Sequence, residues 1–359
     1  MKGPVADPFP SPPSLRFRTY SSGASIKFSS CASDIVAVAS NSHFGMAGKG
    51  IQQVFRTGAH MREKEGEKRV KEGEGGEVGN ERYNMGEVGR HERGGGVEEI
   101  ARFISPSTIF SSCFSEEDGD LLLSACGDGI VRGWSIVEGS KCLYEWKGGH
   151  AKEINDVAYT LLGSEVFLSG GWDGNVCMWS VRRAEPMAVW RQHSTTVYDV
   201  TWSPRDPYLA LTAAGDGFAV VIDTREGKQL IRTCVHDGGE VLSATFDKYD
   251  SNLILTGGAD GSIRAFDLRR MHEPTCMMLG HDLAVKEIQS SPFRSGVVAS
   301  VSYDMSCRVW DLKQAPHCQR SVLHPHTEFI TSVDWSVHDS GILGTTSWDN
   351  TAAILHVQS

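Results

Sequence analysis

From about residue 109 to its end, the chain alternates short apolar segments with turn residues. The segments are rich in Val, Ile, Thr and aromatic residues, and Gly, Asp or Pro separates them every eight to twelve positions, which favours short antiparallel strands over helices. Six aspartates mark equivalent turns at successive spacings of 45, 43, 44, 44 and 45 residues: Asp128, Asp173, Asp216, Asp260, Asp304 and Asp349. This period is that of a four-stranded β-sheet repeat, so the pattern predicts an all-β fold.

Other residue types keep a fixed distance from these aspartates. A hydroxyl lies four positions before each one: Ser124, Ser169, Thr212, Thr256, Ser300 and Thr345. A bulky residue lies six positions after, at Trp134, Trp179, Ile222, Phe266, Trp310 and Leu355. A histidine precedes five of the aspartates by 23 or 24 positions, at His150, His193, His236, His281 and His326. Because the set recurs once per repeat, a structural role is favoured over a metal site or an acid–base pair.

This set is the WD-repeat pattern, and the chain resembles that family. The resemblance implies a β-propeller in which the aspartate accepts a hydrogen bond from the histidine, which continues through the hydroxyl to the tryptophan. Such charge-assisted bonds contribute about 1.5–3 kcal/mol each when sheltered. Complete sets occur twice, ending at Trp179 and Trp310.

A seventh blade is predicted upstream, without its aspartate. Residues 26–29, 35–39 and 51–55 have the composition of strands. The last repeat ends only four residues beyond Leu355, so it lacks an outermost strand. Residues 15–20 alternate apolar with polar side chains, and we expect them to supply that strand and close the ring, which removes exposed sheet edges. The prediction is a seven-bladed propeller over residues 14–359.

Two segments lie outside this pattern. Residues 1–13 are proline-rich and carry no apolar stretch of the signal-peptide kind, so they are expected to form a tail. Residues 57–107 are interpreted as a low-complexity insertion, expected to be disordered; within 61–99, 29 of 39 residues are Glu, Gly, Arg or Lys. These four residues are also encoded by all-purine codons, so two origins stay open: a solvated loop, or a translated intron.

Charge and composition exclude several function classes. The net charge of −10 argues against a protein that binds nucleic acid or an anionic membrane. No window approaches 18 apolar residues, so no membrane span is predicted. The nine cysteines are odd in number and form no C-x-x-C pair, which favours buried free thiols over disulfides or a zinc site. We expect no metal, no cofactor and no enzymatic activity, because phosphate loops and nucleophile–base arrangements are missing outside the structural sets.

In WD-repeat proteins two positions of each blade face the top surface: the residue before the turn aspartate and the residue about three after the histidine. The first set here is Gly127, Trp172, Gly215, Ala259, Tyr303 and Trp348. The second set is Glu153, Thr196, Glu240, Ala284 and Phe329, with Glu328 beside it. Single aromatic groups there could equally stack on neighbouring blades. Three aromatic groups with acidic neighbours favour a binding patch.

A narrower resemblance is carried by Phe44-Gly45 in the atypical first blade, Ser302-Tyr303-Asp304, and His326-Thr327-Glu328-Phe329. On these residues the chain resembles the receptors for the type 2 peroxisomal targeting signal (the peroxin 7 family), over about residues 16–56 and 109–359. The resemblance implies a monomeric import receptor that shuttles between cytosol and peroxisome, where it lies in the matrix or at the membrane. Its implied partners are cargo proteins, a co-receptor and the docking complex of the peroxisome.

The cargo signal of that family is an N-terminal nonapeptide that begins with Arg or Lys and an aliphatic residue and ends with His or Gln and then Leu or Ala. At about 100° per residue, its positions 1, 2, 5, 8 and 9 lie on one face of a helix. The resemblance assigns Glu153 and Glu240 to its basic end. The candidate peptide-binding residues are therefore Glu153, Trp172, Glu240, Tyr303, Glu328 and Trp348.

The chain departs from the family at the start of the second blade: the position of the usual acidic residue falls near Ser107 and Thr108, and the histidine of this blade is missing. Two explanations stay open: a wrong gene model has altered the sequence there, or this protein has a weakened basic-end pocket. The alternative hypothesis is a WD-repeat scaffold or substrate adaptor, for example of a ubiquitin ligase, with a different peptide ligand.

Overall fold

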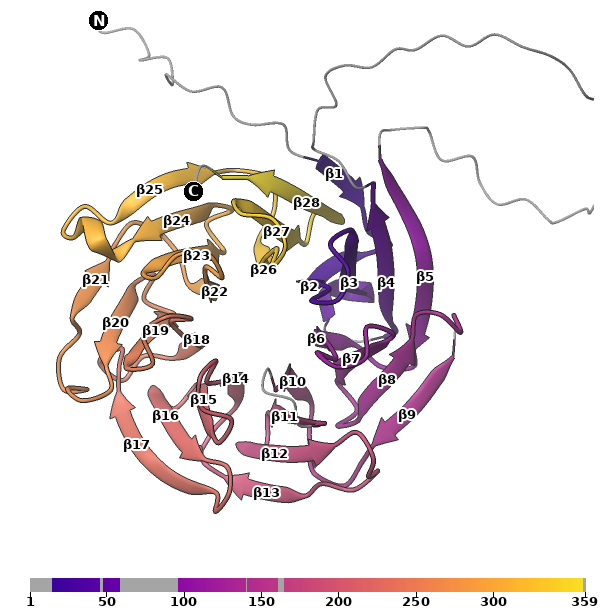
Figure 1. The fold of residues 1–359 in the computed structure, drawn as a ribbon, viewed down its shortest axis with the longest axis horizontal. Coiled ribbons are helices and arrows are strands. Elements are labelled where there is room, and N and C mark those ends of the chain that lie inside the picture. The colour runs from indigo at the N-terminus through magenta and orange to yellow at the C-terminus, as the bar shows by residue number, and fades with distance from the viewer. Residues whose placement is uncertain (1–14, 46–47, 59–95, 140, 161–164, 358–359) are drawn as a thin grey trace, which may run out of the picture.

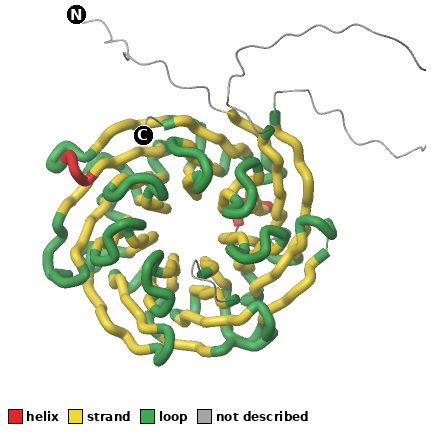
Figure 2. Tube along the Cα trace, in the orientation of Figure 1, coloured by secondary structure: helices red, strands yellow, loops and turns green. Residues whose placement is uncertain are grey.

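The structure is a computed structural model that describes residues 15–45, 48–58, 96–139, 141–160 and 165–357. Their strands form seven four-stranded antiparallel sheets, arranged as blades in a ring (Figure 1). The ring confirms the predicted all-β, seven-bladed propeller. Loops and turns connect nearly all strands, and the described residues contain only two short 3-10 helices, η1 (Ser42–Gly45) and η2 (Leu312–Gln314) (Figure 2).

Each blade runs from an inner strand at the axis to an outer strand at the rim. Blade 1 consists of β2 (Ser22–Phe28), β3 (Ile35–Asn41), β4 (Gly50–Thr57) and β5 (Val97–Ser105). Blade 2 consists of β6 (Ile109–Phe114), β7 (Leu121–Cys126), β8 (Val131–Ser135) and β9 (Cys142–Trp146). Blade 3 consists of β10 (Ile154–Tyr159), β11 (Val166–Gly171), β12 (Asn175–Ser180) and β13 (Ala188–Arg191). Blade 4 consists of β14 (Val197–Trp202), β15 (Leu209–Ala214), β16 (Phe218–Asp223) and β17 (Lys228–Cys234). Blade 5 consists of β18 (Val241–Phe246), β19 (Leu253–Gly258), β20 (Ile263–Asp267) and β21 (Cys276–Met278). Blade 6 consists of β22 (Val285–Ser290), β23 (Val297–Ser302), β24 (Cys307–Asp311) and β25 (Gln319–Leu323).

Blade 7 is built from both ends of the propeller. Its first three strands are β26 (Ile330–Trp335), β27 (Ile342–Ser347) and β28 (Thr351–His356). The outer strand is β1 (Leu15–Arg18), which pairs antiparallel with β28, with Leu15 opposite Ile354. The pairing lies where the sequence placed it, and it covers the edge that β28 would otherwise expose.

The predicted boundary of the insertion is wrong at its C-terminal side. The sequence pattern places residues 97–105 in the low-complexity stretch, but they form β5 and pair along β4 from Thr57↔Val97 to Gly50↔Ser105. Its burial alternates near Arg102 as expected of a rim strand, with Ala101 and Phe103 buried and Arg102 and Ile104 exposed. The proline-rich tail 1–13 and most of the insertion lie outside the described residues.

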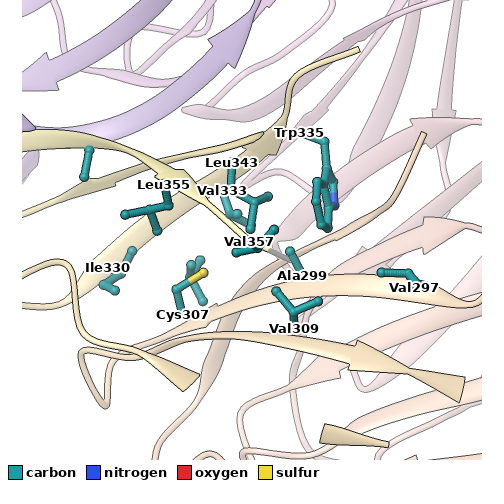
Figure 3. Close-up of a cluster of buried hydrophobic side chains, with 12 residues drawn as sticks. Val297, Ala299, Cys307, Val309, Ile330, Val333, Trp335, Leu343, Leu355 and Val357 are labelled. Carbon is teal, nitrogen blue, oxygen red and sulfur yellow. The ribbon is translucent and has the colours of Figure 1, made fainter. Parts of the chain in front are cut away.

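The core lies between neighbouring blades rather than within any one of them. Figure 3 shows one such layer, in which Val309 of blade 6 belongs to the same buried cluster as Val333, Trp335 and Leu343 of blade 7. Leu343 is fully buried and Trp335 is only 5% exposed. Both faces of every blade are covered by another blade, so the middle strands are buried at consecutive positions, as β7 and β23 are along their whole length.

The predicted hydrogen-bond chain is present in blade 3. Trp179 Nε1 lies 2.8 Å from Ser169 Oγ, His150 Nε2 lies 2.7 Å from the same oxygen, and His150 Nδ1 lies 3.1 Å from Asp173 Oδ1. Because an indole N–H only donates and an ionised carboxylate only accepts, donation runs from Trp179 to Ser169 to His150 to Asp173. Blades 4 to 7 repeat the histidine–aspartate contact.

Blade 2 has the aspartate but no histidine, and two other side chains take its place. Ser124 Oγ donates to Gln52 Oε1 of blade 1 at 3.2 Å and still accepts from Trp134 Nε1 at 3.0 Å. Asp128 accepts two hydrogen bonds from the guanidinium of Arg132, at 3.0 and 2.6 Å. The polar atoms of the turn are therefore satisfied without the histidine.

Candidate functional site

Every inner strand carries a one-residue β-bulge at its start, seen as a break in register with the next strand of its blade. The seven extra residues are Ala24, Phe110, Asn155, Tyr198, Leu242, Lys286 and Thr331. A bulge re-aims its side chain away from the regular alternation of the strand. All seven residues line the same hollow at one end of the propeller axis, which we call the central hollow.

The central hollow has a volume of about 360 Å³. Its floor is the ring of bulge residues, and its wall includes the residues that directly precede three of the turn aspartates, namely Ala259, Tyr303 and Trp348. Ala284 and Glu240 contribute from the loops that enter blades 6 and 5. We call this end of the propeller the top face.

Four aromatic rings form a continuous arc along one side of the top face. Ring centroids are 5.1 Å apart for Tyr303 and Phe329, 5.4 Å for Phe329 and Trp348, and 5.3 Å for Trp348 and Phe44. Tilted contacts at this separation are favourable for aromatic pairs. Phe44 is 51% exposed although its ring is held by Trp348, so the arc offers apolar surface to a ligand.

Phe44 is presented by a strained turn. It lies in η1, where the first blade would otherwise have its turn aspartate, and both His43 and Phe44 have left-handed backbone angles, with φ of 50° and 57°. Such angles are uncommon for residues other than glycine and cluster at functional sites.

A second hollow, of about 520 Å³, adjoins the first and shares Phe44, Gly45 and Phe110 with it. Its own lining includes Glu153 and Trp172. Trp172 is 41% exposed, and its ring centroid lies 6.0 Å from that of Phe110. Its indole nitrogen lies 3.4 Å from Asn155 Oδ1, and its backbone N–H donates to the Glu153 carbonyl at 2.8 Å. We call it the side hollow.

Carboxylates accompany both hollows. Glu153 is half-buried in the side hollow, and Glu240 is exposed at the edge of the central hollow, where the Tyr198 hydroxyl lies 3.4 Å from its Oε2. Burial, followed by the Glu240 charge, raises the pKa of Tyr198, so this hydroxyl stays a donor at neutral pH. Ser107 and Thr108, the hydroxyl residues at the position where an acidic residue was expected, also line the side hollow.

The structure thus brings together five of the six predicted site residues. Glu240, Tyr303 and Trp348 line the central hollow, and Glu153 and Trp172 line the side hollow. Glu328 lines neither; its side chain is exposed, and its carbonyl accepts a hydrogen bond from Ser347 at 3.1 Å.

Comparison with known proteins places this architecture in a family. The model of the WD domain, G-beta repeat, matches residues 140–180, 184–223, 228–267, 273–311 and 317–354. A peroxisomal targeting signal 2 receptor of Saccharomyces cerevisiae is 26% identical over 335 residues, covering 76% of this chain and 88% of the yeast protein. Receptors of the same name from Mus musculus and Homo sapiens are 31% and 32% identical, over 81% and 68% of their lengths. The chain belongs to the WD-repeat family of peroxisomal targeting signal 2 receptors.

In this member of the receptor family, sequence reasoning missed several residues that line the top face. Phe44 was noted only as part of a family motif, and Phe110, Tyr198 and Lys286 were not singled out. The bulge positions do recur with spacings of 43 to 45 residues from Phe110 onward, but their side chains share no chemistry. A nearly constant spacing in sequence between each turn aspartate and the bulge position of its blade is the only signal that could have identified them.

Beneath the floor, the residue that follows the bulge connects one blade to the next in five of the inner strands. Asp156 accepts from the Val200 N–H at 3.0 Å, Asp199 from the Ala244 N–H at 3.0 Å, and Glu287 from the Val333 N–H at 3.1 Å. The hydroxyls of Ser243 and Ser332 accept in the same way, at 3.2 and 3.1 Å. These bonds fix the blades relative to one another, and with them the floor of the central hollow.

Lys27 places a positive charge beside these carboxylates, with Nζ 2.8 Å from Glu287 Oε1. Burial alone would lower the pKa of Lys27, but Glu287 and Asp334 outweigh it and raise the pKa, so the ammonium stays charged. Burial raises the pKa of Asp334 to about 6. Over the described residues, no group of three or more His, Cys, Asp or Glu side chains could hold a metal ion. No helix in the described ranges is long and apolar enough to cross a membrane.

Proposed function

We propose that this chain is an import receptor that binds the N-terminal type 2 peroxisomal targeting signal of cargo proteins on its top face. The observation that carries the proposal is the pair of adjoining hollows, with an aromatic arc on one side and Glu153 and Glu240 at separate places along the lining. Receptors named for this signal are the relatives to which the chain is 31% and 32% identical. An apolar trough with acidic groups suits a ligand that is apolar on one face and basic at one end.

An amphipathic helix matches this surface better than an extended strand. Strand addition would require an unpaired sheet edge, whereas the inner strands that reach the top face are paired within their blades and hydrogen-bonded to the next blade. A nine-residue helix presents its positions 1, 2, 5, 8 and 9 on one face. The basic first residue would lie at Glu153 or Glu240, and the aliphatic residues against Trp172, Tyr303 and Trp348.

A co-receptor completes the proposal. A helix of nine residues is marginal in water, because nucleation is unfavourable and few hydrogen bonds follow it. A second protein that covers the outward side of the bound signal would supply the missing apolar contacts. The complex would then carry cargo from the cytosol to the docking complex and into the peroxisomal matrix. Glu328, which lies outside both hollows, is better suited to contact such a partner than the signal itself.

The test is fluorescence-anisotropy binding of a labelled peptide that bears a type 2 signal, with and without a candidate co-receptor. The control peptide has its first basic residue replaced by Glu. The proposal expects saturable binding that the co-receptor strengthens and that the control peptide loses. Equal binding of both peptides, or no binding with the co-receptor present, would overturn it and leave a propeller with the scaffold or adaptor role.

A further inference from the structure

Two cysteine side chains from neighbouring blades touch each other at the rim. The Sγ atoms of Cys276 and Cys318 are 3.4 Å apart, and 42 positions separate the residues in sequence. Cys276 begins β21, the outer strand of blade 5, and Cys318 directly precedes β25, the outer strand of blade 6. Among the described residues, which include all nine cysteines, no other pair of thiols lies within hydrogen-bond distance.

Backbone pairing to a neighbouring strand holds both partners in place. Cys276 is paired with Ala265 in the sheet of blade 5. The carbonyl of Cys318 accepts from the Asp311 N–H at 2.7 Å, which attaches it to β24. Both side chains contribute to the apolar layer around Met278 and Trp310; Cys318 is 3% exposed, whereas Cys276 is half-buried. The two sulfur atoms therefore meet through packing between blades, not through a flexible loop.

We propose that a peroxide oxidises Cys276 and Cys318 to a disulfide that joins blade 5 covalently to blade 6. In the first step the Cys276 thiol loses its proton, its thiolate attacks one peroxide oxygen, and the O–O bond breaks. With hydrogen peroxide the leaving hydroxide takes up the released proton, so the products are a sulfenic acid and water. In the second step the Cys318 sulfur attacks the sulfenic sulfur, the S–O bond breaks, and a second water leaves with the Cys318 proton. The two thiols lose two electrons and two protons in total, and the peroxide is the oxidant.

The surroundings determine how fast this reaction proceeds. Burial, together with the hydrogen bond shared with Cys318, raises the pKa of Cys276 to about 11, so little thiolate is present at neutral pH. The first step is therefore slow, and the disulfide accumulates during sustained exposure rather than in seconds. Once a sulfenic acid forms, the partner sulfur is already in contact, so the second step needs no rearrangement of the blades.

The closed loop, 276–318, contains β22, β23 and β24. These strands and their connections carry Ala284, Lys286 and Tyr303, which line the central hollow. A cross-link across 42 positions restricts the unfolded chain and so stabilises the native one. The oxidised protein is thus expected to resist unfolding more strongly than the reduced protein, in the part of the ring that supports the aromatic arc.

Peptide mapping of the full-length protein tests the proposal directly. Trypsin releases each cysteine in its own peptide, 271–286 for Cys276 and 314–320 for Cys318. After incubation with hydrogen peroxide and alkylation of free thiols, we expect these peptides to be recovered linked, and dithiothreitol to separate them. Recovery of both peptides alkylated, or of Cys276 as sulfinic acid, would overturn the proposal, as would a link from Cys276 to any other cysteine.

Melting temperatures of cysteine variants test whether the Cys276–Cys318 disulfide stabilises the protein. Peroxide should raise the melting temperature of the wild type and of a Cys234→Ser control, whose exposed cysteine lies on β17, and should leave Cys276→Ser unchanged. An equal rise in Cys276→Ser would show that another reaction is responsible. The wild-type peptide map remains decisive if Cys276→Ser does not fold. Neither readout uses a targeting peptide, so the outcome is independent of the proposed receptor function.

Discussion

Phe44 packs against Trp348 with ring centroids 5.3 Å apart, and this contact joins the first blade to the last across the seam of the ring. The same seam is closed at the rim by β1 and β28. Phe44 lies in the left-handed η1 turn, while Trp348 comes directly before the aspartate of blade 7. The degenerate first blade therefore extends the aromatic arc instead of interrupting it.

Phe44→Ala should weaken binding of a type 2 signal peptide about tenfold, because an exposed ring held rigidly by a neighbour is typical of residues that dominate binding energy. Stability should change little, since Phe44 is 51% exposed. Anisotropy titration and a melting curve measure the two effects. The matched control is Tyr208→Ala, a ring 48% exposed directly before β15, at the opposite end of that strand from the aspartate turn. Equal loss of affinity in both variants would assign the effect to something other than the arc.

Glu153→Lys should weaken signal-peptide binding without unfolding the protein. The carboxylate lies half-buried in the side hollow, and reversal of its charge would repel a basic residue there. We expect a loss of about tenfold or more in affinity, larger at low salt. Glu138→Lys, an exposed acidic residue in the turn between β8 and β9, is the charge-matched control. Normal melting together with unchanged affinity removes Glu153 from the site.

The aspartate register was visible in the sequence because its hydrogen-bond chain needs particular chemistry at each position. A hydroxyl, an imidazole and a carboxylate cannot be exchanged freely, so the residue types of Ser169, His150 and Asp173 recur along the chain. The position of Trp179 varies more, because an aliphatic side chain or a phenylalanine can fill the same apolar space in other repeats. The bulge residues, in contrast, share only a backbone geometry that directs their side chains to the central hollow, and this geometry does not require a particular residue type. Phe110 and Lys286 occupy equivalent positions on the floor of the central hollow with no chemistry in common.

The rim strand β5 was hidden for a related reason. A rim strand exposes one face to water, so Arg102 is compatible with a sheet. The register shift between Ala101 and Glu99 interrupts the alternation, and Glu98 and Glu99 are both exposed. In the sequence they continue a tract of Glu, Gly, Arg and Lys without a visible break. Only the pairing with β4 shows that these residues form a strand and not a continuation of the low-complexity tract. The sequence does not reveal this pairing, because it joins residues as far apart as Thr57 and Val97. Glu328 is the opposite case, a residue that the sequence pattern predicts in the site but that lines neither hollow. Its position in the repeat predicts the face of the propeller but not the direction of its side chain.

Asp304→Ala should lower the free energy of unfolding by about 1–3 kcal/mol, because it leaves buried partners without an acceptor. Asp304 accepts from His281 Nδ1 at 2.8 Å and from the backbone and hydroxyl of Ser306 at 2.9 and 2.6 Å. Burial alone would raise the pKa of Asp304, but these contacts hold it well below its usual range. Urea unfolding measures the change. An unaltered midpoint in the variant would contradict the structural role of the repeated aspartates.

Asp173→Asn should destabilise the protein at neutral pH and lose that effect in acid. Burial alone would raise the pKa of Asp173, but hydrogen bonds from His150 and from the backbone of Ala151 and Asn175 lower it to about 2. The pKa of an aspartate in the unfolded chain is about 3.9, so between this pH and the native pKa the native state binds fewer protons than the unfolded state. The stabilising contribution is therefore complete above about pH 4 and is lost as the pH falls toward 2. Unfolding of both proteins from pH 2 to 7 should show converging curves; a constant gap would exclude the ionised form as the cause.

Lys27→Met should be the most destabilising of these changes, at about 3–5 kcal/mol, because it removes one partner of an ion pair whose two side chains are each only 17% exposed. Glu287 would keep its backbone donor at Val333 but lose the ammonium 2.8 Å away. Burial alone would raise the pKa of Glu287, but Lys27 and the hydrogen bonds hold it below its usual value, so without Lys27 an uncompensated charge remains.

The double variant Lys27→Met/Glu287→Gln separates charge from packing. The introduced glutamine keeps an oxygen for the Val333 N–H and carries no charge, so the double variant should recover much of the stability that Lys27→Met loses. A thermodynamic cycle from urea unfolding of the four proteins gives the coupling between the two side chains. Additive losses would show that the two groups act independently, and would remove the ion pair as the link that fixes blade 1 against blades 6 and 7 beneath the central hollow.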